Sequence, residues 1–447
     1  MTRRILFVVP AIGKKPGERY IATWKMEPLA VAVLAALTRA HGGWEASLAD
    51  DRLELVPMAP DVDLVAIAVE TYTAKRSYQL ADRFRAQGLP VVLGGYHPTL
   101  LPDEAACHAD ALVIGNAEAV WGRLLDDAAR GHLAPRYEGG SGALPPAPDR
   151  SIYAGKRYVP VGLEETGRGC PHHCDFCAIA SYYGSAYHPR PVADVIRDLH
   201  DSGRRLHFLV DDNLVANRRY LGELLQALRK EKFKWAGQGT LSMARDPELL
   251  AALRQAGCEF ILIGFESLES ENLRQMKKEV NLLPDERDQL VRRIHQAGLG
   301  IYATFVFGYD HDDEASVART LDFARRHRFY TAAFNHLLPW PGTPLYRRLE
   351  TEGRLRYERW WLADDYRYGD FAFEPKRISA EKLSALCLEA RQAFGRPGIF
   401  WQRAWAALRR GTPGLWYLFW AMNLNIGGEV TQKYAIPLGA NLDELPK

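Results

Sequence analysis

Short apolar stretches alternate with longer amphipathic ones over the first 130 residues. Stretches of helical length and spacing lie at 27–40 and 78–87. The apolar runs of strand length are 5–10, 44–50, 63–69, 90–95 and 109–115. Strands that are apolar along their whole length and separated by helices indicate a parallel sheet covered on both faces. The pattern predicts a Rossmann-like, doubly wound domain with ligands beyond the carboxyl ends of its strands.

The same alternation returns in the second half of the chain. One strand is expected just before Cys170, and the others are expected at 207–212, 234–241, 260–266, 300–308 and 331–339. About six β/α units predict a partial (β/α)6 barrel of the TIM type, with its chemistry at the carboxyl ends of the strands. The last hundred residues are predicted to be mostly helical, and they carry several aromatic clusters.

A stretch rich in Gly, Pro and Ser at 139–151 separates the two halves and marks a linker. The fold class is therefore α/β, with four predicted segments. They are a Rossmann-like domain at 1–135, a linker at 136–160, a partial barrel at 161–350 and a helical extension at 351–447.

Composition narrows the possible partners. Fifty-seven basic and 55 acidic residues leave a formal net charge of +2, which is too balanced for a protein that binds a nucleic acid backbone. The longest apolar run near the C-terminus, 415–422, has about half the length of a membrane span. The protein is expected to be cytoplasmic and to act on a small molecule.

Three of the six cysteines, Cys170, Cys174 and Cys177, stand within eight positions with the spacing C-x3-C-x2-C. Three thiolates on one loop can hold three irons of a [4Fe-4S] cluster and leave the fourth iron without a protein ligand. The alternatives are a zinc site or inert cysteines. Zinc needs a fourth ligand at characteristic spacing, and the sequence has no such partner motif.

This cysteine spacing, with Phe176 directly before the last cysteine, resembles the signature of the radical S-adenosylmethionine (SAM) superfamily. The resemblance implies a [4Fe-4S] cluster that binds SAM and cleaves it reductively to methionine and a 5′-deoxyadenosyl radical. It also implies an electron donor such as ferredoxin or flavodoxin.

The resemblance further implies that SAM is bound at the ends of the barrel strands. There, VDDN would contact the methionine amino group, Glu266 the ribose or carboxylate, and Gly308 the adenine. A salt-bridged residue at the rim is the alternative for Glu266. The candidate SAM contacts are Phe176, Asp211, Asp212, Gln238, Thr240, Ser242, Glu266 and Gly308.

The N-terminal half is similar to the cobalamin-binding (B12) domain of a subgroup that contains cobalamin-dependent methyltransferases and anaerobic tetrapyrrole cyclases. The resemblance rests on the segments at 70–81, 91–105 and 109–118. For the two glycines among the candidate residues, a tight turn without a ligand is the alternative. The candidate cobalamin contacts are Arg52, Thr71, Thr73, Gly94, Gly95 and His97.

One departure concerns the motif D-x-H-x-x-G, which supplies a histidine ligand to cobalt. This chain has Arg52 in the place of the histidine and Leu55 in the place of the glycine. Arginine has no lone pair for a metal. Cobalamin would therefore bind without a histidine ligand, although loss of the cofactor would leave the same change.

Two functions follow as hypotheses. The first is a cobalamin-dependent radical SAM C-methyltransferase that acts on an unactivated carbon of a hydrophobic substrate. The alternative is a cobalamin-free radical enzyme that makes a cyclisation, C–C coupling or rearrangement and keeps an empty B12-type domain. Near the C-terminus, the aromatic residues 416–420 and two arginines, Arg409 and Arg410, suggest either core packing or a peripheral membrane contact.

Overall fold

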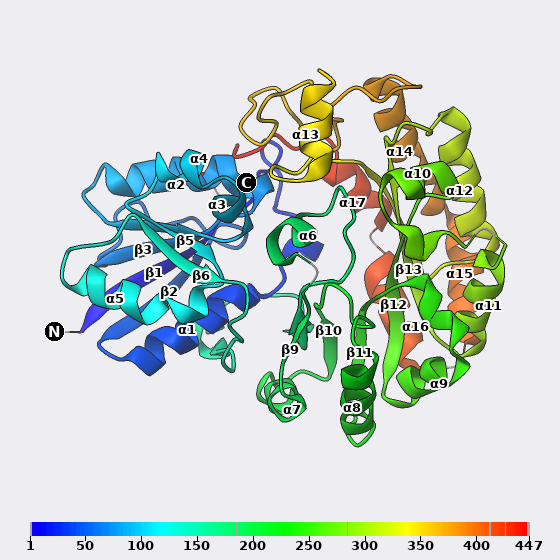
Figure 1. The fold of residues 1–447 in the computed structure, drawn as a ribbon, viewed down its shortest axis with the longest axis horizontal. Helices are drawn as coiled ribbons and strands as arrows, with labels where there is room; N and C mark the ends of the chain where they lie inside the picture. The colour runs from blue at the N-terminus through cyan, green and yellow to red at the C-terminus, as the bar shows by residue number, and fades with distance from the viewer. Residues whose placement is uncertain (1, 185, 284, 411–412, 425, 445–447) are drawn as a thin grey trace.

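Two six-stranded parallel sheets form the framework of the chain in a computed structural model (Figure 1). The structure describes residues 2–444 except 185, 284, 411–412 and 425. The N-terminal sheet, called sheet A here, and the second sheet, sheet B, lie side by side, and the C-terminal residues run back from sheet B towards sheet A. The α/β fold class is therefore confirmed.

Sheet A has the strand order β2-β1-β3-β4-β5-β6 and is parallel throughout. One face packs against α1 and α5, and the other against α2, so apolar side chains are buried on both sides of β1 and β3. The strands are β1 (Arg3–Val9), β2 (Trp44–Asp50), β3 (Leu64–Ala68), β4 (Val91–Gly94), β5 (Ala111–Gly115) and β6 (Arg136–Gly140). The helices are α1 (Leu29–His41), α2 (Ala74–Arg85), α3 (Tyr96–Leu100), α4 (Pro102–Ala106) and α5 (Trp121–Ala129).

The sixth strand was not expected from the sequence. β6 falls in the first residues of the predicted linker, where glycine and charged residues hide the strand pattern. It pairs with β5 at the edge of sheet A, and Tyr137 is its one fully buried side chain. As an edge strand, β6 leaves the backbone groups of one side without a strand partner. Sheet A therefore continues five residues past the predicted domain boundary.

Sheet B has the order β7-β10-β11-β12-β13-β14, so that consecutive β/α units are neighbours, as the partial barrel predicted. Its strands are β7 (Gly162–Glu164), β10 (Leu206–Leu209), β11 (Lys234–Gly239), β12 (Cys258–Glu266), β13 (Gly300–Phe307) and β14 (Thr331–His336). A small antiparallel pair, β8 (Gly167–Arg168) and β9 (His188–Pro189), lies beside β7 in sequence. The helices between them are α6 (Ala178–Tyr183), α7 (Val192–Asp201), α8 (Arg218–Leu228), α9 (Pro247–Gln255), α10 (Ser270–Gln275), α11 (Arg287–Gln296), α12 (Glu314–Arg326) and α13 (Pro344–Thr351).

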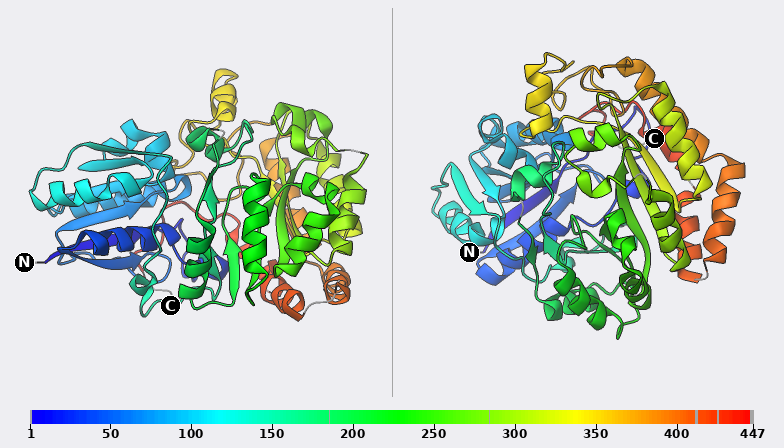
Figure 2. Two further views of the ribbon diagram at one scale, coloured as in Figure 1. Left: turned by 60° about the horizontal axis from the view of Figure 1, so that its bottom comes forward. Right: turned by 45° about the vertical axis from the view of Figure 1, so that its right-hand side comes forward.

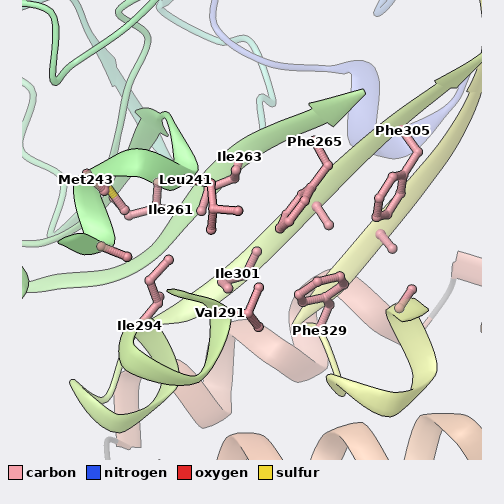
Figure 3. Close-up of a cluster of buried hydrophobic side chains, with 14 of the residues drawn as sticks. Leu241, Met243, Ile261, Ile263, Phe265, Val291, Ile294, Ile301, Phe305 and Phe329 are labelled. Carbon is pink, nitrogen blue, oxygen red and sulfur yellow. The ribbon is translucent and has the colours of Figure 1, made fainter. Parts of the chain in front are cut away.

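The two faces of sheet B differ in burial. On β13, Ile301 and Phe305 are fully buried on the helical side, where Figure 3 shows them with Phe265 of β12 and Ile294 of α11. The alternate residues of β13, including Tyr302, stay partly exposed on the inner side. Successive side chains of a strand point to opposite faces. The outer face is therefore the core. The inner face is partly reached by solvent, but near the beginnings of the strands Phe260 and Tyr302 pack against the C-terminal helices.

The extension after the barrel contains α14 (Ala380–Phe394), α15 (Pro397–Arg409), α16 (Pro413–Asn423) and α17 (Ile426–Lys433). Leu415 and Phe419 of α16 pack on Phe260 and Tyr330, near the beginnings of β12 and β14, so this part of the aromatic segment is core. No described helix is long and apolar enough to cross a membrane. Figure 2 shows α15 and α16 at the end of the barrel far from the N-terminus.

After α17 the chain returns to sheet A. Gly439 donates its backbone N–H to the carbonyl of Ile12, and Lys14 donates its N–H to Ala440. Leu438 is buried among residues of sheet A, and Asp443 forms an ion pair with Arg76 of α2. The end of the chain therefore belongs to the packing of the N-terminal sheet, which the sequence pattern did not reveal.

Candidate active site

The cysteine loop follows β8 and ends at α6. Cys174 is buried, while Cys170 and Cys177 are partly exposed, and all three thiols are free. Asn213 directs its amide Nδ2 at Cys170 Sγ at 3.8 Å. Cys177 is the residue directly before α6. Because a single loop between sheet B and a short helix carries all three thiols, their separation is fixed by local structure.

The VDDN motif after β10 anchors this loop. Both carboxylate oxygens of Asp211 are occupied: one accepts from the Thr166 N–H at 2.7 Å, and the other from the Thr166 and Tyr187 hydroxyls. Asp212 accepts from the Gly169 N–H at 2.9 Å and stays partly exposed. Both oxygens of Asp211 are thus used within the protein, and its contact with the methionine amino group stays a prediction. Asp212 keeps one oxygen available for a bound molecule.

Phe176 and Glu266 meet at Lys278. Lys278 forms an ion pair with Glu266, and its ammonium lies 5.9 Å from the centre of the Phe176 ring. Glu266 has a φ of 63°, an unusual left-handed conformation for a residue with a side chain. The salt-bridged alternative for Glu266 is therefore what the structure contains, which leaves a contact with SAM ribose as a prediction only.

Burial raises the pKa of all three thiols, to about 12 for Cys174, and the charge of Lys278 acts in the opposite direction. A neighbouring cation favours the thiolate, which is the form that binds iron. In the described part of the chain, no three His, Cys, Asp or Glu side chains converge on a point that could hold one metal ion. Cysteines of a four-iron cluster bind different irons and need not converge. The loop therefore suits a cluster better than a zinc ion.

The third-strand candidates lie beside this loop. Thr240 and Ser242 hydrogen-bond to each other at 3.0 Å and, with Pro171, His172 and Asn213, line a cavity of about 410 Å³. Gln238 of β11 is partly exposed and, two residues before Thr240, is expected to point to the same face of the sheet. The structure therefore brings these three polar side chains to the same strand end as the cysteines. Their contact with SAM stays a prediction.

Gly308 lies directly after β13. Its φ is 124°, and its N–H donates to Asp312. A Cβ there would meet Phe371 at 2.7 Å and Phe373 at 3.1 Å. The side of Gly308 on which a Cβ would stand is therefore filled by aromatic rings of the later chain, and the approach of adenine to this glycine stays a prediction. The turn needs glycine for its backbone conformation and for these rings.

At the carboxyl end of β2 in sheet A, Arg52 is held within the protein. Its guanidinium donates to both oxygens of Asp50 and to the backbone carbonyls of Trp24 and Met26. Tyr158 also donates to Asp50 at 2.8 Å. Every one of these contacts is internal. In this structure Arg52 therefore stabilises the turn after β2 through contacts within the protein, and its contact with cobalamin stays a prediction.

The polar candidates after β3 and β4 are also used internally. His97 is fully buried, with one ring nitrogen 3.2 Å from the Thr71 hydroxyl and the other 3.0 Å from Glu104. Thr73 accepts a hydrogen bond from the Glu70 N–H in a capping box of the short 3-10 helix Thr71–Thr73, which precedes α2. In this structure the polar atoms of Thr71, Thr73 and His97 have partners within the protein, and their contact with cobalamin stays a prediction. Their polar atoms hold the turns at this edge.

The two glycines of this edge have different roles. A Cβ on Gly95, whose φ is 116°, would lie 2.6 Å from the carbonyl oxygen of Val69, so the turn itself requires glycine. A Cβ on Gly94 would make only ordinary contacts. Gly95 and the neighbouring Glu70 nevertheless remain exposed. The surrounding protein raises the pKa of the Glu70 carboxyl by desolvation, although the residue as a whole is exposed.

Two contacts join the cysteine loop to the edge of sheet A. Tyr182 of α6 donates its hydroxyl to Asn116, after β5, at 2.8 Å, and packs edge-on against Tyr96. Arg168 of β8 forms a partly buried ion pair with Glu118 at 2.8 Å. α6 lies between the two sheets (Figure 1). The exposed ends of β3 and β4 and the cysteines therefore belong to one connected region.

Sequence reasoning missed Lys278 and the role of Asn213 in this region. Lys278 lies in a loop after α10 without a motif, and only the fold brings it to the cysteines. Asn213 was visible as the last letter of VDDN. The strand-end position that drew attention to Asp211 and Asp212 applies equally to Asn213, so that signal could have identified it.

Comparisons with known proteins agree with this geometry. Residues 165–324 match the model of the radical SAM superfamily. Two bacteriochlorophyllide d methyltransferases of Chlorobaculum tepidum are similar. The C-12(1) enzyme is 33% identical over 72% of this chain and 72% of its own length, and the C-8(2) enzyme is 29% identical over 74% and 78%. The solved structure of the cobalamin-dependent SAM radical enzyme OxsB, with aqua-cobalamin and SAM bound, is similar in fold. Its TM-score is 0.68 at 13% identity, over 96% of this chain and 72% of that one.

A partial parallel barrel with three cysteines on a strand-end loop defines a radical SAM enzyme. The chain belongs to the radical SAM superfamily. Within it, the chain has the architecture of the subgroup that carries a Rossmann-like, B12-type domain before the barrel. The [4Fe-4S] cluster and SAM are the cofactors that this membership implies.

Proposed function

We propose that this protein is a cobalamin-dependent radical SAM C-methyltransferase whose substrate is a tetrapyrrole. The similarity to the C-12(1) bacteriochlorophyllide methyltransferase, 33% identity over 336 residues that include the cysteine loop's domain, carries the proposal. The second similar methyltransferase acts on the same class of pigment. The aromatic side chains between the two sheets, such as Tyr72 and Tyr368, suit a flat hydrophobic ring.

The cofactor chemistry sets the requirements for the site. When bound, a reduced [4Fe-4S] cluster with SAM supplies a 5′-deoxyadenosyl radical, and methylcobalamin supplies a methyl group. Cys170, Cys174 and Cys177 would hold the cluster, and Lys278 favours their thiolate form. The other carboxylate oxygen of Asp212 would accept a hydrogen bond from the amino group of SAM.

Cobalamin would lie at the carboxyl edge of sheet A without a protein ligand to its metal. The residues fit this arrangement, because Gly95 and Glu70 are exposed at neighbouring strand ends and Arg52 is fixed to Asp50. Because glycine has no Cβ, the backbone at Gly95 allows a large flat ligand to come close. The internal use of His97 supports the same view, since no imidazole is left there for the metal.

Anaerobic reconstitution with iron, sulfide and hydroxocobalamin tests the function. After desalting, we expect a corrin absorption spectrum. With SAM, a reductant and bacteriochlorophyllide d, we expect 5′-deoxyadenosine, S-adenosylhomocysteine and a methylated pigment by mass spectrometry. Deoxyadenosine without retained corrin or S-adenosylhomocysteine would contradict methyl transfer and favour the cobalamin-free radical enzyme. The Cys174→Ala protein controls for background cleavage of SAM.

We further propose that α15 and α16 bind an anionic membrane surface. Trp401, Trp405 and Tyr417 are 59%, 56% and 68% exposed. The guanidinium carbon of Arg409 lies 5.7 Å from the centre of the Trp405 ring, and the sequence has no acidic residue between Glu389 and Glu429. Exposed tryptophans with basic neighbours favour the interface of an anionic bilayer. A hydrophobic pigment could then enter from the membrane, while a cytoplasmic ferredoxin or flavodoxin supplies electrons.

Sedimentation with lipid vesicles tests this surface. We expect the protein to bind phosphatidylglycerol vesicles and the W401A/W405A variant to lose most of this binding. Met58→Ala removes another exposed apolar side chain, 59% accessible, from the N-terminal domain and should change nothing. Equal binding by both variants would contradict a membrane contact at α15. A change of oligomeric state in W401A/W405A would instead identify this face as an interface between copies of the chain.

A further inference from the structure

Arg391 reaches from α14 around the edge of the barrel. β14 is the last strand of sheet B, and Arg391 donates its Nε to the backbone carbonyl of Phe334 at 2.7 Å. Its Nη2 donates to the side-chain oxygen of Asn335 at 3.4 Å. Asn335 pairs in register with Val306 and, like it, is partly exposed, which places it on the inner face. The guanidinium therefore lies at the inner face of the barrel.

This guanidinium has no acidic partner. Both of its hydrogen bonds go to neutral oxygens, and in the described part of the chain no Asp or Glu oxygen lies within 4.0 Å of it. Arg52 and Arg76 of sheet A, by contrast, are both paired with aspartates. A partly buried cation is costly without a countercharge. Within the described residues the protein therefore supplies no countercharge to Arg391, and a bound anionic group would provide one.

Polar groups around Arg391 are also unsatisfied. Nε2 of the buried His336 has no hydrogen-bond partner. Burial, together with Arg391, lowers the pKa of His336 to about 3, so its ring is neutral. Burial raises the pKa of Tyr302 and Tyr368, and the charge of Arg391 opposes that shift. Within the described residues, neither tyrosine hydroxyl makes a hydrogen bond in this structure.

This cluster stands between the two sheets. Tyr368 packs on Trp24 and Tyr72 of the N-terminal domain, at centroid distances of 5.2 and 5.3 Å. Tyr368 also packs edge-on against His336, and Tyr302 lies on the inner side of β13. A substrate that meets both a radical from the barrel and a group carried on sheet A must lie between them. Arg391 is therefore placed beside substrate.

We propose that Arg391 binds a carboxylate of the substrate, with Asn335, Tyr302 and Tyr368 as additional donors. The inference rests on the proposed function, because chlorophyllide pigments carry a free propionate carboxyl group. A guanidinium matches a carboxylate with two parallel hydrogen bonds. The alternative is that Arg391 only covers the open edge of β14. That role would explain its hydrogen bond to Phe334 but not the missing countercharge.

Binding of matched pigments to the purified full-length protein tests the proposal without turnover. The probes are chlorophyllide a and its propionate methyl ester, and the readout is quenching of tryptophan fluorescence. We expect the free acid to bind at least about tenfold more tightly than the ester. Arg391→Gln should remove this preference by weakening only the acid, and Arg391→Lys should restore part of it, because lysine keeps the charge but not the bidentate geometry.

Two controls keep the outcomes distinct. Arg396→Gln changes an exposed arginine just after α14 and should leave the preference intact. If neither pigment binds, the tetrapyrrole assignment fails, and 1-pyrenebutyrate with its methyl ester then tests Arg391 alone. Equal affinity of wild type for acid and ester, or an acid preference that survives in Arg391→Gln, would overturn the carboxylate site.

Discussion

The carboxyl edges of the two parallel sheets differ in which charged residues they leave without a partner. At sheet A, Arg52 and Arg76 are paired with Asp50 and Asp51. At sheet B, the unpaired Arg391 and the partly exposed Gln238 and Asp212 remain accessible. The same rule places ligands at both edges. The difference shows that the rule locates a site but does not tell which side chains are left free for a ligand.

The largest expected effect is at the cysteine loop. Cys174→Ala should abolish cluster assembly and SAM cleavage, because two thiolates cannot hold a cluster that needs three protein ligands. Iron analysis after reconstitution, about four irons per chain in the wild type, and 5′-deoxyadenosine formation measure it. Cys107→Ala alters an exposed cysteine of the N-terminal domain and should behave as wild type. A Cys174→Ala protein with full iron content would refute the assignment.

A substitution at the carboxyl edge of sheet A should change the free energy of unfolding and not the cleavage of SAM. Asp51 is fully buried beside Arg76, so Asp51→Asn leaves a buried guanidinium with only the exposed Asp443 as partner. We expect the free energy of unfolding to fall by about 3 kcal/mol in urea titrations. The deoxyadenosine yield of the remaining folded protein should stay unchanged. Asp61→Asn breaks an exposed pair with Arg4 and should cost less than about 0.5 kcal/mol.

A substitution of Asp212 should weaken SAM binding and leave the stability of the fold nearly unchanged. Asp212→Asn keeps an oxygen for the Gly169 N–H but removes the negative charge, so SAM binding should weaken by about tenfold. The midpoint of thermal unfolding should change little. Equilibrium dialysis with SAM on the reconstituted protein measures the affinity. If Asp212→Asn bound SAM as tightly as the wild type, Asp212 would not contribute to SAM binding. Its polar atoms, like those of Arg52 in sheet A, would then serve contacts within the protein only.

The smallest expected effect concerns pH. Burial by itself would raise the pKa of Asp310, but hydrogen bonds from Lys376, Gln275 and Arg354 lower it well below its usual range. A carboxyl whose pKa is lower in the folded than in the unfolded state stabilises the fold above about pH 4, and this contribution is lost as the pH falls. Asp310→Asn should therefore cost about 1 kcal/mol at pH 7 and progressively less towards pH 2. Urea unfolding across this range measures the difference.

An exposed aspartate provides the control for that titration. Asp365 is exposed, so Asp365→Asn should shift the unfolding curve little at any pH. A loss of stability in Asp310→Asn that stays constant from pH 7 to pH 2 would contradict the charge-based explanation and indicate a packing effect.

Parts of the site were predictable because they depend on local spacing. The three cysteines and Phe176 lie within eight residues, so their place on one loop follows from the chain itself. The strand ends at Asp212, Thr240 and Glu266 follow from the length of the apolar runs. The surroundings of His97 and Gly308 did not follow, because Thr71 and Phe371, which are distant from them in the sequence, fill the space around them.

The sequence by itself determined the two parallel sheets, the cysteine loop and the absence of a histidine at Arg52, because each rests on neighbouring residues. Tertiary structure decided which polar groups are occupied. Lys278 reaches the cysteines, Asp443 reaches Arg76 and Arg391 reaches the inner face of the barrel across long stretches of chain. Charge pairing acts through space at a few ångströms, and the linear order of residues does not contain those distances.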